Sequence, residues 1–157
     1  MEIKMIKGSY GIMLPEFFLN TKEDTIKNYN GEDSVVFIPD GIVNLGQMAF
    51  YINPRIQKVV LSSTVKFIRA QCFWNCLSLS EINFPEGFTT IGKEAFRNCP
   101  SLRAIRLPKT IKTIGDLAFE KTALSQILYE GTEAQWNKIK MTEEDRSRLN
   151  AIVQFLG

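Results

Sequence analysis

The sequence predicts an α/β repeat solenoid, a right-handed coil with a parallel β-sheet on one face and short helices on the other, capped at both ends. A marker phenylalanine recurs every 23 residues, at Phe50, Phe73, Phe96 and Phe119. Other apolar positions keep the same spacing, and the composition of the 157 residues, 45% apolar and 23% charged, is that of a globular domain. A fixed period near twenty residues is typical of solenoids, in which each coil buries its apolar face only against its neighbours.

Several columns of the repeat keep their chemistry from one copy to the next. Small residues precede the marker phenylalanine in all four copies, and three further columns are apolar throughout. These columns are Ala49, Cys72, Ala95 and Ala118; Ile38, Leu61, Phe84 and Leu107; Ile42, Val65, Phe88 and Ile111; and Leu45, Ile68, Ile91 and Ile114. We therefore expect all of them to point into one continuous core.

Each copy begins with a stretch of alternating apolar and variable residues, which is the strand period. The stretches are 58–61, 81–84, 104–107 and 126–129, and we expect them to form one parallel sheet. Prolines follow three of the expected strands, at Pro39, Pro85 and Pro108, where they end the ladder. A second short extended stretch follows each turn, and Gly46, Gly92 and Gly115 then permit entry into about two turns of helix.

The ends of the chain depart from the repeat and predict caps. We expect an N-terminal cap over 1–34, repeats over 35–132 in about four to five coils, and a helical cap over 133–157. In the first cap, 1–7 and 17–19 are predicted to be extended, with a turn at 29–31.

In the C-terminal cap, Thr142 is predicted to be an N-cap that precedes three acidic residues. The helical spacing of Leu149, Ile152, Val153 and Leu156 predicts an amphipathic helix that covers the last coil. The alternative is that this helix docks a partner or a second copy of the chain.

Taken together, these residues resemble a known family. The pattern is clearest in Phe84-Pro85, Ile91-Gly92, Ala95-Phe96, Asn98-Cys99, Ser101-Leu102 and Ile105 to Pro108, and the segment 129–139 looks like one that often closes such arrays. The chain resembles the bacterial BspA-like, or Treponema pallidum-type, leucine-rich repeat family over roughly residues 26 to 140. The resemblance implies a curved binding solenoid, commonly displayed on bacterial or protist surfaces, that engages other proteins and has no catalytic residues.

The balance of charge and the absence of histidine exclude several function classes. A formal charge of +2, with no lysine or arginine stripe along the repeats, argues against nucleic acid and membrane surfaces as partners. The chain contains no histidine, which removes the usual general base and all Ser-His-Asp and Cys-His sites. The adjacent acids Glu143, Glu144 and Asp145 are interpreted as partners of a helix dipole rather than as a catalytic pair. We expect no enzymatic activity, cofactor or metal.

Three cysteines, Cys72, Cys76 and Cys99, occur in the repeats. The odd number argues against a complete disulfide framework, and we interpret the thiols as buried structural residues. Cys76 and Cys99 occupy equivalent positions in successive coils, so a disulfide between them is the alternative. Three thiols without histidine make a poor zinc site.

The location of the protein is left open by the sequence. The first residues lack the apolar run of a secretory leader, and no stretch approaches a membrane span, so the chain as written predicts a cytoplasmic protein. A longer gene product or a removed export signal are alternatives. The family resemblance implies the cell surface.

A candidate contact face lies on the outward side of the expected sheet. Its central column is Phe37, Val60, Asn83, Arg106 and Leu128, and Lys58 and Glu81 flank it. Large apolar residues beside an arginine are typical of a protein-binding surface. Loops, caps or neighbouring modules are alternative sites, and Tyr51 and Trp74 are the next candidates.

The predicted function is a non-catalytic protein-binding module for recognition or adhesion, a monomer with a protein partner of unknown identity. The alternative is an intracellular scaffold or spacer that has no ligand of its own.

Overall fold

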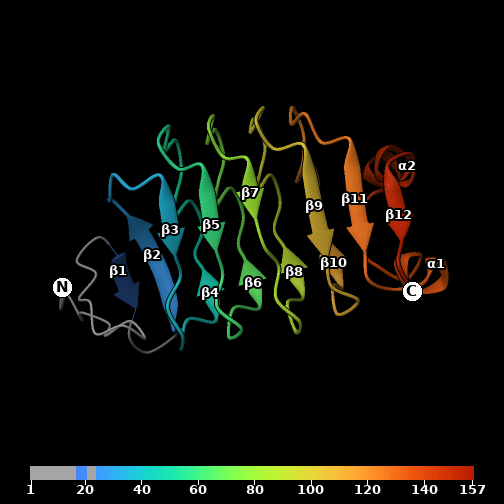
Figure 1. The fold of residues 1–157 in the computed structure, drawn as a ribbon, viewed down its shortest axis with the longest axis horizontal. Helices are drawn as coiled ribbons and strands as arrows, with labels where there is room; N and C mark the ends of the chain where they lie inside the picture. The colour runs from blue at the N-terminus through green and yellow to red at the C-terminus, as the bar shows by residue number, and fades with distance from the viewer. Residues whose placement is uncertain (1–16, 21–23) are drawn as a thin grey trace.

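The computed structural model describes residues 17–20 and 24–157 and shows stacked coils along one axis, with strands on two sides (Figure 1). The second strand of each coil belongs to a six-stranded sheet. Its members in spatial order are β1 (Phe17–Asn20), β2 (Thr25–Tyr29), β4 (Asn44–Leu45), β6 (Phe67–Ile68), β8 (Thr90–Ile91) and β10 (Thr113–Ile114). β1 is antiparallel to β2, and every later pair is parallel. The predicted parallel-strand solenoid is confirmed.

The first strands of the coils form a second row that is divided into two three-stranded sheets, here called the split sheet. One half contains β3 (Val35–Phe37), β5 (Lys58–Val60) and β7 (Glu81–Ile82). The other half contains β9 (Ala104–Leu107), β11 (Gln126–Tyr129) and β12 (Val153–Phe155). The prediction of one uninterrupted sheet in this row is therefore wrong, because no ladder joins β7 to β9 in this fully described part of the chain.

The segments after Gly46, Gly92 and Gly115 are tight turns rather than the two turns of helix that we expected. Two residues in each segment have left-handed backbone angles, for example Met48 (φ 57°) and Ile52 (φ 56°), which a right-handed helix cannot contain. The amide groups of these segments alternate between two kinds of acceptor, the carbonyl three residues earlier and a carbonyl of the next coil. Phe50 N–H, for example, donates to the Cys72 carbonyl over 2.9 Å.

The marker phenylalanines form a stacked ladder through the core, as the repeat predicted. Centroid separations are 4.9 Å for Phe50–Phe73, 5.3 Å for Phe73–Phe96 and 5.5 Å for Phe96–Phe119, with interplanar angles of 16°, 7° and 5°. Tyr29 extends the ladder upstream, with its ring 5.2 Å from that of Phe50. The predicted apolar columns are all buried. One core therefore runs through all the coils.

The C-terminal cap consists of α1 (Glu133–Trp136), α2 (Glu143–Asn150) and β12. The predicted helical stripe through Leu156 is wrong beyond Asn150, because residues 153–155 pair in parallel with β11 and so cover its edge. Only Leu149 of the stripe is buried, whereas Leu156 is 46% exposed. The predicted N-cap is confirmed, because Thr142 Oγ1 accepts a hydrogen bond from the backbone of Asp145 over 3.1 Å.

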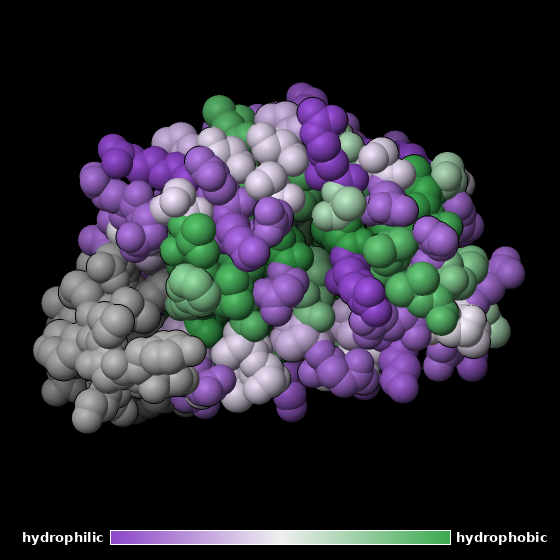
Figure 2. Space-filling model, in the orientation of Figure 1, coloured by the Kyte–Doolittle hydropathy of each residue, from purple (hydrophilic) through white to green (hydrophobic). Residues whose placement is uncertain are grey.

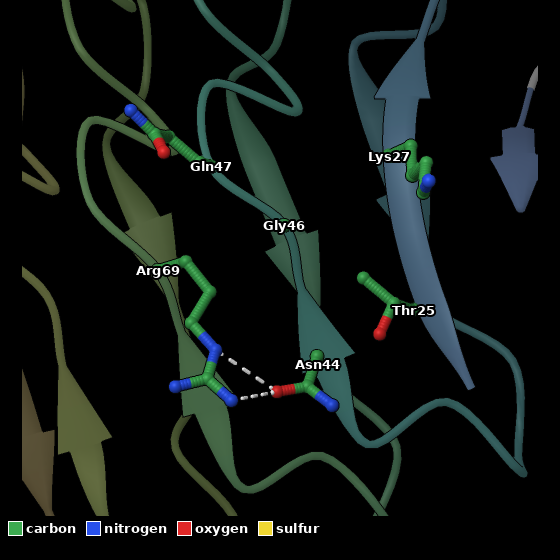
Figure 3. Close-up of a pocket in the computed structure, with 6 residues that line it drawn as sticks. All are labelled: Thr25, Lys27, Asn44, Gly46, Gln47 and Arg69. Carbon is green, nitrogen blue, oxygen red and sulfur yellow. Dashed lines mark hydrogen bonds between the residues drawn. The ribbon is translucent and has the colours of Figure 1, made fainter. Parts of the chain in front are cut away.

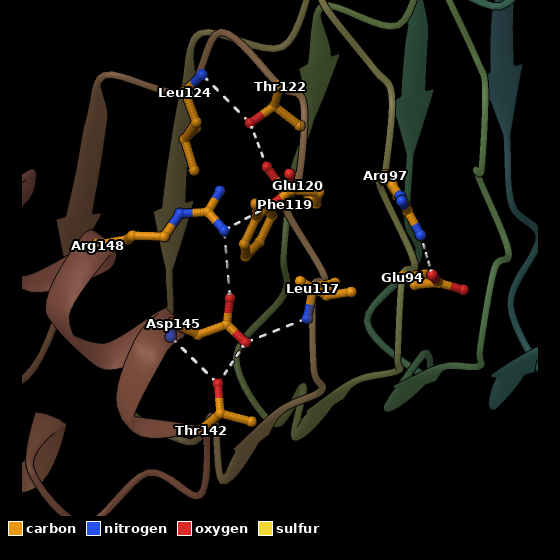
Figure 4. A network of polar contacts seen from close by, with 10 residues as sticks. All are labelled: Glu94, Arg97, Leu117, Phe119, Glu120, Thr122, Leu124, Thr142, Asp145 and Arg148. Atoms are coloured by element: carbon orange, nitrogen blue, oxygen red, sulfur yellow. Dashed lines mark hydrogen bonds and ion pairs between the residues drawn. The ribbon is translucent and has the colours of Figure 1, made fainter.

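Asp145 is the only buried charged residue in the described part of the chain, and it joins the cap to the last coil (Figure 4). Its Oδ2 atom accepts hydrogen bonds from Leu117 N–H over 3.1 Å and from the Thr142 hydroxyl over 2.8 Å. Arg148 lies 3.9 Å from the other carboxylate oxygen and 2.6 Å from Glu120. The acids at 143–145 are thus part of the helix start and its attachment.

At the N-terminus, the predicted extended segment at 17–19 is confirmed by β1, and the one predicted at 1–7 lies outside the described residues. β2 continues through Tyr29, where we expected a turn to begin. The Tyr29 hydroxyl donates to the Asp33 carboxylate over 3.0 Å, which bridges the segment between β2 and β3. The division into 1–34, 35–132 and 133–157 stays a prediction.

Candidate functional site

The candidate contact residues lie on the outer face of the split sheet. Parallel register places Phe37 beside Val60 in one half, and Arg106 beside Leu128 in the other. Phe37 is 63% exposed. Figure 2 shows this face of the molecule, with apolar residues gathered in a band across its middle.

At the end of β7, the Asn83 side chain bonds to the backbone of the preceding coil. Its side-chain Oδ1 accepts from Leu61 N–H over 2.8 Å, and its Nδ2 donates to the Leu61 carbonyl over 3.2 Å. The side-chain amide thereby takes the backbone partners that a continued β7 would use on β5. β7 ends at Ile82, and its outer edge faces the edge of β9 without a ladder.

A hollow of about 520 Å³ lies at this break. Its walls include Ala104 and six of the seven candidate residues, which are Lys58, Val60, Glu81, Asn83, Arg106 and Leu128. Phe37, the seventh, is not among the residues that line it. The fold therefore brings the predicted column together around a depression that the sequence did not predict.

The charges around the hollow are neutralised in pairs. Lys58 Nζ lies 2.9 Å from Glu81 Oε2, and Arg106 Nε lies 2.6 Å from Glu130 Oε1. Both pairs are largely exposed, so they contribute little to folding stability. The arrangement is an aliphatic centre, from Val60 and Leu128, with polar groups at its margin.

A second apolar surface lies along the turns of the first two full coils. Tyr51 and Trp74 stack there with ring centroids 5.0 Å apart. Sequence reasoning named these two residues but missed Met48, Ile52 and Leu77, which are 39%, 47% and 45% exposed. The signal in the sequence was the change of two of these columns from apolar to polar in later copies, from Tyr51 to Glu120 and from Ile52 to Lys121.

All three cysteines are buried free thiols. Cys76 Sγ donates to the Phe50 carbonyl over 3.1 Å, and Cys99 Sγ donates to the Phe73 carbonyl over 3.0 Å, so both thiols bind the backbone of the preceding coil. Burial raises the pKa of each of these two thiols to about 12, and burial also raises the pKa of Cys72. The thiols are therefore part of the packed core. Within the described residues, no group of three His, Cys, Asp or Glu side chains is placed to hold a metal ion.

None of the helices described is long and apolar enough to cross a membrane.

Solved structures with the same fold come from several bacteria. A leucine-rich cell surface protein from Faecalibacterium prausnitzii is 24% identical, with a TM-score of 0.62 over 85% of this chain and 42% of that one. A leucine-rich repeat protein from Bacteroides ovatus is 26% identical, with a TM-score of 0.62 over 80% of this chain and 38% of that one. The leucine-rich repeat protein of T. pallidum is 28% identical, with a TM-score of 0.54 over 71% of this chain and 67% of that one.

The chain spans about two fifths of the length of the first two of these proteins. A comparison with curated proteins gives no match. The model of the BspA type leucine rich repeat region matches residues 23–139 in six copies, and repeats of this kind generally serve protein interaction and are typically not catalytic. The six matched copies, the buried apolar columns and the paired strands agree, and the chain belongs to the BspA-type leucine-rich repeat family.

Proposed function

We propose that this chain is a non-catalytic recognition module that binds a protein partner at the hollow between β7 and β9. The observation that carries the proposal is the clustering of six outward side chains around one depression, with an aliphatic centre and an ion-paired margin. Protein interfaces commonly have this organisation, in which an apolar centre is excluded from water and a polar rim surrounds it.

Two further features support binding rather than chemistry at this place. The chain has no histidine, and the polar groups of the hollow are engaged with one another or, in Asn83, with the backbone of Leu61. No ladder joins β7 to β9, so backbone groups at the floor of the hollow can bond to side chains of a partner.

We propose that the module works at the cell surface in adhesion-like recognition. The F. prausnitzii structure with the same fold is described as a cell surface protein, and this supports the proposal.

Photo-cross-linking from a defined position tests the proposed surface and the location together. A photoreactive residue replaces Leu128 in the hollow or, as the control, exposed Lys109 between β9 and β10, and both proteins are expressed in the producing bacterium in contact with host matrix proteins. We expect a discrete adduct with an extracellular protein from position 128 and none from position 109. Equal adducts from both positions would contradict the surface, and an adduct with a cytosolic protein would favour an intracellular scaffold.

A matched pair of variants then measures the contribution of the hollow to affinity for the partner so captured. Val60→Ala with Arg106→Ala should weaken binding at least tenfold, while the unfolding midpoint stays unchanged. Leu77→Ala with Arg103→Ala removes the same kinds of side chain from exposed positions outside the hollow, so binding should persist. Unchanged affinity in the first variant would overturn the assignment of this surface.

A further inference from the structure

The outer side of the six-stranded sheet carries an excess of cationic side chains. Lys27 follows Ile26 in β2, and Lys66 and Arg69 directly precede and follow β6. Lys93 lies two residues after β8, Lys112 directly precedes β10, and Lys140 forms a parallel bridge with Thr113 of β10. The six cations are Lys27, Lys66, Arg69, Lys93, Lys112 and Lys140. The acids beside the same strands are Asp24, Asp116 and Glu94, which follows Lys93, so three acids stand against six cations and the excess on this side is positive.

The cations of this sheet differ from those of the split sheet in their pairing. Around the split sheet, Arg55, Lys58 and Arg106 each have a carboxylate within 3.1 Å, whereas Arg103, directly before β9, has no ion pair among the described residues. In the described part of the chain, none of the six cations of the six-stranded sheet has a carboxylate within ion-pairing distance. Their positive potential is therefore available to a ligand.

Two of the cations flank a hollow of about 520 Å³ (Figure 3). The register of β2, β4 and β6 aligns Ile26, Leu45 and Ile68, so the residues that follow them, Lys27, Gly46 and Arg69, occupy one row. Gly46 leaves the middle of the row open. A Cβ atom there would lie 2.6 Å from the Ile26 carbonyl oxygen, so close packing of the coils requires this residue to be glycine.

The side chains around this hollow suit an anionic group. Arg69 Nε and Nη2 both donate to Asn44 Oδ1, over 3.0 Å and 2.6 Å, and the guanidinium lies 4.7 Å from the centroid of the Phe67 ring. These contacts fix the guanidinium and leave its remaining N–H donors to other acceptors. Thr25, Gln47 and Lys27 complete the lining, and no carboxylate takes part.

The remaining chemistry of the face distinguishes between classes of polyanion. Among the large exposed apolar residues of the described chain only Met48, in the turn after β4, lies near this sheet, and a single such residue does not make the apolar centre of a protein interface. The sheet also lacks a row of exposed aromatic rings on which nucleic-acid bases would stack. The cations spread over strands from β2 to β10, a distance of about 19 Å at the usual strand spacing.

From this we infer a second binding surface, separate from the proposed protein-binding hollow: the six-stranded sheet binds an anionic polysaccharide. The polymer lies across the strands, and one of its carboxylate or sulfate groups occupies the hollow over Gly46 between Lys27 and Arg69.

The test measures binding of the full chain by titration calorimetry to size-defined heparin oligosaccharides and to oligogalacturonate, with neutral dextran and a DNA duplex as comparisons. We expect binding to at least one anionic glycan at low salt, none to dextran, and weaker binding to DNA. The heparin and oligogalacturonate arms distinguish sulfate from carboxylate. Affinity should fall as sodium chloride rises from 50 to 200 mM, because the contacts are ionic.

Two double variants that each lose two positive charges distinguish binding at this surface from a general effect of net charge. Lys27→Gln with Arg69→Gln should weaken glycan binding at least tenfold, whereas Arg103→Gln with Lys109→Gln, which removes two exposed cations elsewhere, should change it less than twofold. If the double variant unfolds, the single variant Lys27→Gln takes its place in the test, because the Lys27 side chain has no ion pair among the described residues whose loss would destabilise the fold. No binding to either glycan, an equal loss in both double variants, or tighter binding to DNA would each overturn the inference.

Discussion

Phe96 shows how one residue position determines the architecture. Its ring stacks between those of Phe73 and Phe119, and it has no exposed surface. Each copy of the repeat places a ring above the previous one, because the coils are in register and the strands on either side are parallel. Rings that are 23 residues apart in the sequence therefore stack on one another, and each further copy of the repeat extends the ladder by one ring.

The first prediction concerns this ladder. Phe96→Ala should lower the free energy of unfolding by about 3–5 kcal/mol, because the substitution leaves a cavity between two coils that cannot close without shifting both. Urea denaturation measures the loss. The control is Phe37→Ala at a 63% exposed side chain, which should cost less than about 0.5 kcal/mol. A loss below about 1 kcal/mol at Phe96 would contradict its place in the core.

The buried thiols predict a dependence of stability on alkaline pH. In the folded chain the pKa of Cys76 and of Cys99 is about 12, whereas both thiols ionise near pH 9 once unfolded. Above about pH 9 the unfolded state loses protons that the folded state keeps, so the free energy of unfolding falls as pH rises towards 12. Each such thiol contributes a slope of up to about 1.4 kcal/mol per pH unit.

Urea titrations in reductant between pH 7 and pH 11 measure this slope. Cys99→Ala removes one of the titrating thiols, and the variant should show a shallower decline than the wild type. Tyr129, whose pKa burial also raises, remains in both proteins and adds equally to both slopes. Identical slopes in the two proteins would contradict the prediction, because they would show that the pKa of Cys99 is the same in the folded and unfolded states.

At the scale of elements, the sequence predicted inward columns better than it predicted the backbone between them. Columns such as Leu45, Ile68, Ile91 and Ile114 are buried as expected, because an apolar position repeated four times has one consistent environment. The helices were wrong because the left-handed angle at Met48 and its equivalents belongs to varied non-glycine residues that carry no turn signal. Asparagine, which tolerates this angle, occurs only at the second position, in Asn75 and Asn98, where it indicates the end of the segment rather than the conformation before it.

The C-terminal cap shows a related limit. Ile152 and Val153 fit a helical period, but they also fit a strand, and the unpaired edge of β11 decides in favour of the strand. That choice depends on a neighbour 26 residues earlier, Ile127, which pairs with Val153. Local periodicity alone contains no information about it.

The attachment of α2 is itself testable. Asp145→Ala should lower the free energy of unfolding by about 2–4 kcal/mol, because Leu117 N–H and the Thr142 hydroxyl lose a charged acceptor in a buried place. The control Ser147→Ala lies in the same helix at an exposed position and should change stability by less than about 0.5 kcal/mol. Thermal and urea unfolding measure both variants, and equal small effects would show that the network does not hold the cap.

At the scale of the whole molecule, surfaces proved harder to predict than the core. The outward column of the split sheet could be listed from the repeat, but the hollow lies at the break between β7 and β9, and the residue columns continue through that break without a change that marks it. The basic side was missed because its cations occupy different columns of the repeat, such as Lys66 and Lys93, and only stacking places them on one sheet.

The last prediction concerns the cap as a cover for the whole solenoid. Deleting residues 141–157 removes β12, and with it the hydrogen bonds from Ile127 N–H to the Ile152 carbonyl, 2.9 Å, and from Leu156 N–H to the Tyr129 carbonyl, 2.8 Å. β11 then becomes an unprotected edge strand, which is a template for pairing with another chain. We expect a lower unfolding midpoint together with self-association, measured by light scattering after size-exclusion chromatography.

A second substitution separates edge pairing from simple unfolding of the shortened chain. A lysine in place of Leu128 puts a charge on the exposed edge strand, which disfavours association without restoring the lost contacts. The truncated chain with Leu128→Lys should therefore be monomeric while its unfolding midpoint stays low. A truncated chain that is monomeric without the lysine and as stable as the full chain would show that β12 does not protect the end of the solenoid.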